Sequence, residues 1–385
     1  MIGVTTIALS LTACGSSDDS STGSGPITIF QFAPYESQTA SLPYMKTSAQ
    51  AAVEEINATG GVNGRTLRLE TCNEKYDANE ALRCAQKAKQ EHAVAVVGSL
   101  TAFGAQVMPV LESAKIPSIG SDALTPIDTK SPVSYLIDAG VPGYASMPAV
   151  AKKYLGATKL ALIQLEFANA DETKEYVEKG AEESGSQLVS SAEIPTDTVD
   201  FSQYIAKAEA AGAEAIVSSL AAEWTLKLWK AIDATGSKLK VVGSAGSITP
   251  DVAKEGGAAA EGTYIVAGTP SADESNPWGK QYVAAMKKYQ PKETVYAGVG
   301  LRSWAAVHLF ADVAKGIDGD ITNATMATAL DRVHDMPFMW IKRLSFDQPG
   351  PIAAYPRVVS TEAFPARIQG GTLVSKPPFE PFGVD

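Results

Sequence analysis

The chain has 385 residues, of which 45% are hydrophobic and 19% are charged, and its formal net charge is -11. This length suffices for two domains of usual size, and the composition is that of an ordinary folded protein. The negative charge argues against nucleic acid or an anionic membrane surface as a partner, because contacts to phosphate groups require clustered Lys and Arg side chains.

The amino terminus differs from the rest of the chain. Residues 1–13 are uncharged and mostly apolar, which is typical of a signal peptide. The four residues "LTAC" that end at Cys14 resemble the lipobox of bacterial lipoproteins, so Cys14 is expected to carry a lipid anchor. A plain signal peptide with an incidental cysteine is the alternative. Residues 14–26 are rich in Gly, Ser and Asp and are predicted to be a flexible tether, with the folded part held outside the cytoplasm at the membrane.

From residue 27 onward, short apolar runs alternate with segments of helical periodicity. The alternation predicts an α/β fold with βαβ units and parallel sheets. The series is too long for one sheet, and residues 139–150 interrupt it, so two doubly wound lobes are expected. Strands are predicted at 27–30, 66–71, 93–98, 116–120, 159–165, 187–194, 213–220, 239–243 and 262–268; helices are predicted at 41–61, 78–90, 102–114, 171–184, 201–212, 223–236 and 301–316.

Two cysteines, Cys72 and Cys84, lie within the predicted first lobe. If the chain is exported, its compartment is oxidising, and a disulfide would tie a strand end to the following helix. Free buried thiols are the alternative. No metal site is expected, since His92, His308 and His334 show no ligand spacing.

The chain lacks the sequence patterns of common enzymes. There is no GxSxG, HExxH or P-loop motif, and no GxGxxG follows a strand, so no catalytic residues are assigned. Binding is better supported, because ligands of α/β sheets lie at the carboxyl ends of the strands. The loop at 98–106 is the best candidate, with Ser99 and Thr101 as ligand-binding residues or, alternatively, as caps of their own helix.

Several stretches resemble the branched-chain amino acid (leucine-binding) type of ABC-transporter solute-binding protein, a type I periplasmic binding protein. The most specific is "EINATGGVNG" at 55–64, and the resemblance extends over roughly residues 27–345. It implies a monomer that needs no cofactor. The expected partners are a small-molecule solute and the permease subunits of an ABC transporter, and the protein would contact the membrane only through its lipid. It also implies three hinge crossovers between two lobes, which would comprise residues 27–140 with 271–340 and residues 141–270 with 341–385.

The resemblance also places a ligand site in the cleft between the lobes. In amino acid-binding members, one loop of the first lobe binds the ligand carboxylate, and the next loop and an acidic residue of the second lobe bind the ammonium. In this chain Ala102 stands where the hydroxyl residue would be, Leu124 at or beside the threonine position, and Ala245 at the acidic position. The other matching positions are Thr101, Phe103, Ser121, Asp122, Ala123 and Leu220.

These departures bear on the substrate, because a buried ammonium without a carboxylate partner costs several kcal/mol. A less polar ligand is therefore expected: an aromatic or aliphatic carboxylate, an amide or another neutral solute. An amino acid remains the alternative if Asp122, Glu166 or Glu223 replaces the missing acid. A ligand sensor of the same fold is the alternative to a transport protein. Apolar walls are predicted from Tyr35, Phe103, Tyr144, Phe167 and Trp224.

Overall fold

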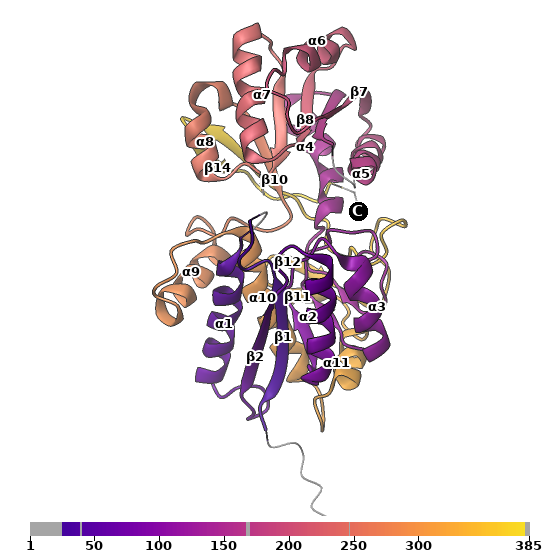
Figure 1. The fold of residues 1–385 in the computed structure, drawn as a ribbon, viewed down its shortest axis with the longest axis vertical. Helices are drawn as coiled ribbons and strands as arrows, with labels where there is room; N and C mark the ends of the chain where they lie inside the picture. The colour runs from indigo at the N-terminus through magenta and orange to yellow at the C-terminus, as the bar shows by residue number, and fades with distance from the viewer. Residues whose placement is uncertain (1–24, 39–40, 167–169, 246, 382–385) are drawn as a thin grey trace, which may run out of the picture.

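The computed structural model describes residues 25–38, 41–166, 170–245 and 247–381, which form two α/β units stacked along the long axis (Figure 1). The signal peptide, Cys14 and nearly all of the tether lie outside the described residues, as does Phe167. None of the helices in the described ranges has the length and apolarity that a bilayer crossing requires.

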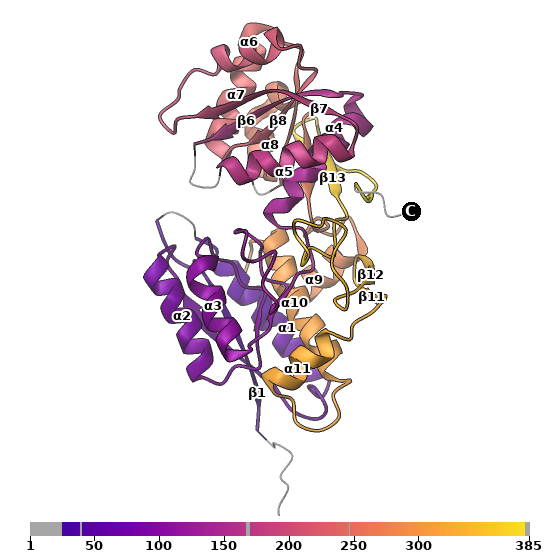
Figure 2. The ribbon, with the colours of Figure 1, turned by 90° about the vertical axis from the view of Figure 1, so that its right-hand side faces the viewer.

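The first unit is built on a five-stranded parallel sheet in the order β2-β1-β3-β4-β5. Alternate residues of β1 point to opposite faces, as in any strand. Ile27 and Ile29 pack with helices α1, α9 and α10, whereas Phe30 and Phe32 pack with α2 and α3 on the other face. Figure 2 shows α2 and α3 together on one side of this unit and α10 and α11 on the other. The bounds are β1 Ile27–Ala33, β2 Leu67–Asn73, β3 Ala95–Val97, β4 Ser118–Ile119, β5 Ser134–Tyr135, α1 Pro43–Ala58, α2 Ala78–Gln90, α3 Gly104–Ala114, α9 Pro277–Tyr289, α10 Gly298–Ala314 and α11 Asn323–Leu330.

The second unit is built on a seven-stranded sheet in the order β14-β13-β10-β9-β8-β6-β7. In β6, Leu160 and Leu162 pack with α4 and α5, whereas Ala161 and Ile163 pack with α6 and α7. The bounds are β6 Lys159–Leu165, β7 Gln187–Ile194, β8 Ala215–Ser219, β9 Lys240–Ser244, β10 Tyr264–Ala267, β13 Phe364–Gln369, β14 Thr372–Ser375, η1 Val141–Ser146, α4 Met147–Leu155, α5 Ala170–Glu183, α6 Ser202–Ala210, α7 Ala222–Thr235, α8 Pro250–Gly256 and η2 Gly257–Ala260.

The structure confirms the predicted α/β class with parallel sheets and adds an antiparallel edge. Strands β13 and β14 form a hairpin that joins β10 in antiparallel fashion. A second hairpin, β11 (Met336–Phe338) with β12 (Ile341–Leu344), packs instead on the core of the first unit. Ile341, Leu344 and Phe346 all belong to that core because they are apolar and buried, so the first unit extends past residue 340.

The chain passes between the two units three times, after β5, after β10 and after β12. Near the first two passages the backbone is crowded. A Cβ atom on Gly268 would lie 3.2 Å from the Cβ atom of Asp138, and one on Gly140 would lie 2.7 Å from the carbonyl oxygen of Ala123. The passages therefore lie beside the loop that follows β4.

The predicted disulfide is confirmed. Cys72, in β2, is bonded to Cys84, in α2, with a Cα–Cα distance of 5.5 Å. The bond closes a short loop, which stabilises the folded state chiefly by restricting the unfolded chain. It also fixes the carboxyl end of β2 against the helix that follows.

Candidate functional site

The carboxyl ends of the first sheet gather the loops that the sequence assigned to ligand binding. The loop after β3 begins at Gly98, whose φ of +54° favours glycine. A Cβ atom there would lie 2.6 Å from the Cα atom of Ser303 in α10, so the loop starts in direct contact with that helix. This close approach determines where residues 99–103 lie.

The hydroxyl groups of this loop are used within the protein. The Ser99 hydroxyl is buried and accepts a hydrogen bond from the backbone N–H of Phe32 at 3.0 Å. The Thr101 hydroxyl accepts one from the N–H of Phe103 at 3.1 Å and donates one to the carboxylate of Glu74 at 3.0 Å. These side chains therefore hold the loop in place, whereas Ala102 and Phe103 are half-buried.

The loop after β4 contains an ion-paired network that the sequence did not reveal. Asp122 binds the guanidinium of Arg302 at 2.7 Å, and Asp138, after β5, binds the same guanidinium at 2.8 Å. Arg302 is only 4% exposed, and its Nε–H group has no hydrogen-bond partner among the described residues. Burial alone would lower the pKa of Arg302, but the two carboxylates raise it above its usual value.

Burial acts on the carboxylates at this edge of the sheet. Burial raises the pKa of Asp122, although the field of Arg302 opposes that rise. Asp128 is buried and accepts hydrogen bonds from the N–H and hydroxyl groups of Thr125; burial raises its pKa to about 6. Asp122 and Asp138 thus share the single guanidinium of Arg302, whereas Asp128 is held by Thr125.

The two loops enclose a cavity of about 10 Å³, which is room for about one water molecule. Four of the predicted ligand residues line it together: Ser99, Thr101, Ser121 and Asp122. The Ser121 hydroxyl is itself bonded to the Ser118 hydroxyl at 2.8 Å. The structure thus brings these residues together, but around a space too small for a solute.

The remaining predicted residues of the first unit lie in or beside packed clusters. Tyr35 is buried, and its hydroxyl donates to the side chain of Gln31 at 2.9 Å; burial raises its pKa well above the usual value. Leu124 is half-buried against the apolar cluster that contains Tyr35. Ala123 is buried where the chain first passes from one unit to the other, after β5. Tyr144, in η1, is half-buried between the clusters of the second unit and of that passage.

In the second unit, the predicted residues follow β8 and β9. Leu220 is buried in the core, whereas Ala245 is half-buried and its N–H bonds to the carbonyl of Val266 at 3.0 Å. Glu223 is exposed and pairs with Lys227 at 2.7 Å. The ammonium of Lys227 also lies 5.4 Å from the ring centre of Trp224, whose buried indole N–H has no hydrogen-bond partner within the described part of the chain.

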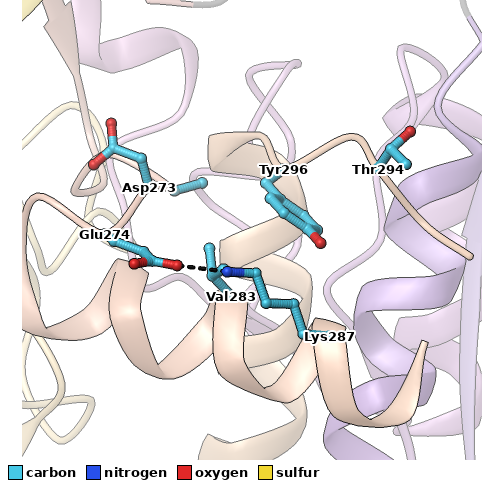
Figure 3. Close-up of a pocket in the computed structure, with 7 residues that line it drawn as sticks. Asp273, Glu274, Val283, Lys287, Thr294 and Tyr296 are labelled. Carbon is cyan, nitrogen blue, oxygen red and sulfur yellow. Dashed lines mark hydrogen bonds and ion pairs between the residues drawn. The ribbon is translucent and has the colours of Figure 1, made fainter. Parts of the chain in front are cut away.

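A larger pocket, of about 310 Å³, lies at α9 and is lined by none of the predicted ligand residues. Figure 3 shows the ion pair of Glu274 and Lys287, 2.7 Å apart, at one side and Tyr296 at the other. Asp273, also at this pocket, accepts hydrogen bonds from Ser271 and Ser275. The charged groups here thus satisfy one another or nearby groups of the chain.

Comparison with known proteins identifies the family of this chain. The sequence profile described as periplasmic binding protein matches residues 33–350, more than half of the chain. The chain belongs to the periplasmic binding protein family. This confirms the resemblance found in the sequence, and membership implies a location outside the cytoplasm and a role in transport, not in catalysis.

Individual relatives agree with this assignment. A Leu/Ile/Val-binding protein homolog of Brucella abortus is 26% identical over 289 residues, which cover 70% of this chain and 72% of the relative. The leucine-binding protein LivK of Thermotoga maritima has a similar fold, with a TM-score of 0.71 and 18% identity, over 92% of this chain and 99% of that chain. A fatty acid ABC transporter substrate-binding protein of Thermomonospora curvata has a TM-score of 0.73 and 18% identity, over 92% of each chain.

Proposed function

We propose that this periplasmic binding protein captures a small solute between its two α/β units and delivers it to the permease of an ABC importer. The observation that carries the proposal is the match of residues 33–350 to the family, together with two parallel sheets linked by three chain passages. The lobes would comprise residues 27–140 with 271–359, and 141–270 with the rest of the described chain, since Arg357 is bonded to Thr129 and Ser131 of the first unit. Closure of the lobes would distinguish the loaded from the empty protein.

We further propose that the solute carries no ammonium group. Three acids could replace the missing partner at Ala245: Asp122 is bound by Arg302, Glu223 is bound by Lys227, and Glu166, after β6, is exposed to solvent. An unpaired ammonium in the closed cleft would therefore be costly. The guanidinium of Arg302 is already bound by both Asp122 and Asp138 and offers no cation to an anionic solute, so an uncharged amide or aromatic compound fits best.

The attachment to the membrane is proposed from the sequence. A lipid on Cys14 followed by the polar tether to residue 26 would keep the protein close to its permease while leaving the lobes free to close. Mass spectrometry of the protein from membranes tests this point, because a diacylated Cys14 would be the first residue of the mature chain. An unmodified Cys14 or a different first residue would refute the anchor.

A thermal-shift screen of the chain without its first 23 residues tests the ligand. The panel contains branched-chain and polar amino acids, aliphatic and aromatic carboxylates, and amides such as phenylacetamide. A compound at about a hundred times its dissociation constant stabilises the folded state by about 2.7 kcal/mol, which is easily measured. A shift with amides or neutral aromatics supports the proposal, whereas a shift with leucine or valine shows that an ammonium is accommodated.

A further inference from the structure

A buried carboxylate that the function does not yet use lies directly behind the loop after β3. Glu74 follows β2 and is fully buried, at 0% exposure. One of its oxygens accepts a hydrogen bond from the Thr101 hydroxyl at 3.0 Å, and the other accepts one from the backbone N–H of Tyr76 at 3.2 Å. The single side chain therefore joins two separate loops at the carboxyl edge of the sheet.

The first of these loops has an unfavourable backbone conformation. Residues 74–77 form a turn closed by the bond from the N–H of Asp77 to the carbonyl of Glu74, at 2.9 Å. Both central residues have positive φ angles, 53° for Lys75 and 57° for Tyr76. Such mirror-image turns favour Gly, Asn and Asp, so Lys and Tyr need additional support to stay there. The bond from Tyr76 to the Glu74 carboxylate provides it.

The second loop is held through Thr101. Its hydroxyl donates its only hydrogen to Glu74 and in return accepts the N–H of Phe103 at 3.1 Å. The rings of Phe103 and Tyr76 meet edge to face, with their centres 5.7 Å apart. Glu74 thus determines the position of both members of an aromatic pair, and Tyr76 is 37% exposed at this edge.

We propose that Glu74 is a positioning residue of the ligand site: its carboxylate holds Tyr76 and Phe103 as an aromatic wall, and protonation of Glu74 loosens that wall and weakens binding. The inference rests on the proposed function in one respect, namely that the wall contacts the solute. As a carboxylate, Glu74 accepts both bonds, each strengthened by its charge. As a neutral acid, it can keep both contacts only by donating its own hydrogen to the Thr101 hydroxyl oxygen, and both bonds then lose the strength that the charge gives them.

The surroundings place this change within reach of ordinary pH. Burial raises the pKa of Glu74 to about 6, although its two hydrogen bonds act in the opposite direction. Among the described residues, the charged group that acts on it is the carboxylate of Asp77, which raises the pKa further. Asp77 itself caps α2 by accepting from the N–H groups of Asn79 and Glu80. The neighbouring Lys75 is exposed.

The first experiment needs no ligand. Amide hydrogen exchange is measured by NMR at Phe103 and Tyr76 in the full chain, between about pH 5 and pH 7.5, and expressed as protection factors. Loss of one charge-assisted bond should lower protection about fivefold at the acidic end. Glu74→Gln should show the reduced protection at every pH, because the amide, like the neutral acid, forms only uncharged hydrogen bonds with Thr101 and Tyr76. Glu70→Gln, on the same strand, is the matched control and should behave like the wild type.

The second experiment measures binding of phenylacetamide and of L-leucine by calorimetry over the same pH range. For the compound that binds, the dissociation constant should rise about fivefold towards pH 5 in the wild type and stay constant in Glu74→Gln. Thr101→Ser, which keeps the hydroxyl, should retain the wild-type profile, whereas Thr101→Val should not.

The two experiments separate the two proposals. Protection at Phe103 that does not change with pH, or that Glu74→Gln leaves unchanged, overturns the role of Glu74 whatever binds. Protection that changes as expected, with no change in the affinity of a bound compound, shows that the wall does not contact the solute. If neither compound binds, the exchange data still decide whether Glu74 positions the wall, and the ligand class proposed above is wrong.

Discussion

Replacement of Arg302 by Met should destabilise the protein strongly. In the wild type the guanidinium binds Asp122 at 2.7 Å and Asp138 at 2.8 Å, and it is only 4% exposed. Methionine fills similar space but leaves two buried carboxylates without a cation. Removing one partner of a buried ion pair costs about 3–5 kcal/mol, because the remaining charge is uncompensated.

The effect of Arg302→Met should also depend on pH in a defined direction. Burial already raises the pKa of Asp122 in the folded state above its value of about 3.9 in the unfolded chain, and without the opposing field of the guanidinium it rises further. The folded variant then binds protons more tightly than the unfolded chain does, so its stability falls as the pH rises. The cost of the substitution should therefore be larger at about pH 7.5 than at about pH 4.5.

Urea unfolding followed by fluorescence and circular dichroism measures this effect. The matched control is Arg343→Met, since Arg343 also binds an aspartate, Asp335, at 2.7 Å, but its side chain is 75% exposed. Exposed pairs contribute little, so the control should unfold at the wild-type urea concentration. If both variants had the same midpoint, the buried network would not stabilise the fold, and our reasoning would be refuted. Adding Asp122→Asn and Asp138→Asn to Arg302→Met should restore part of the loss.

Three further predictions concern other parts of the chain. Burial raises the pKa of Asp128 to about 6, so this carboxyl should make the wild type less stable as the pH rises from about 4 to 6. The variant Asp128→Asn should reduce that loss of stability by up to about 3 kcal/mol. An unchanged slope of urea midpoint against pH would contradict this. Reduction of the disulfide between Cys72 and Cys84, 12 residues apart, should cost about 3 kcal/mol in thermal unfolding, whereas the double alanine variant should be insensitive to dithiothreitol. Gly98→Ala should lower the free energy of unfolding by about 1–3 kcal/mol more than Gly156→Ala does. Both positions have positive φ, but only a Cβ atom at Gly98 meets the backbone of another element, α10. Equal losses of stability would show that the contact with α10 is easily relieved.

Local patterns in the sequence were sufficient for the elements and for the family. The alternation of short apolar runs with helical periodicity is a property of neighbouring residues, and it predicted parallel α/β sheets without knowledge of contacts. The spacing of Cys72 and Cys84 across one strand and one helix was equally local, and the structure confirms their bond. The motif at 55–64 predicted the family, which the match over residues 33–350 confirms. The ligand residues stay predictions.

The network behind the ligand loops depends on contacts that no local pattern encodes. Arg302 lies 164 residues from Asp138 and 180 from Asp122, and a lone Arg within an apolar helix gave no sign of its partners. Glu74 and Thr101 are 27 residues apart and meet only because β1 pairs with both β2 and β3, which places their carboxyl ends side by side. Sequence alone therefore predicted most of the strands and helices, though not β5, α4 or α8, whereas the tertiary structure decided which side chains at the strand ends are bonded to one another. The reason is physical: periodicity follows from burial of one face of each element, but a hydrogen bond or ion pair requires two groups brought within about 3 Å by the whole fold.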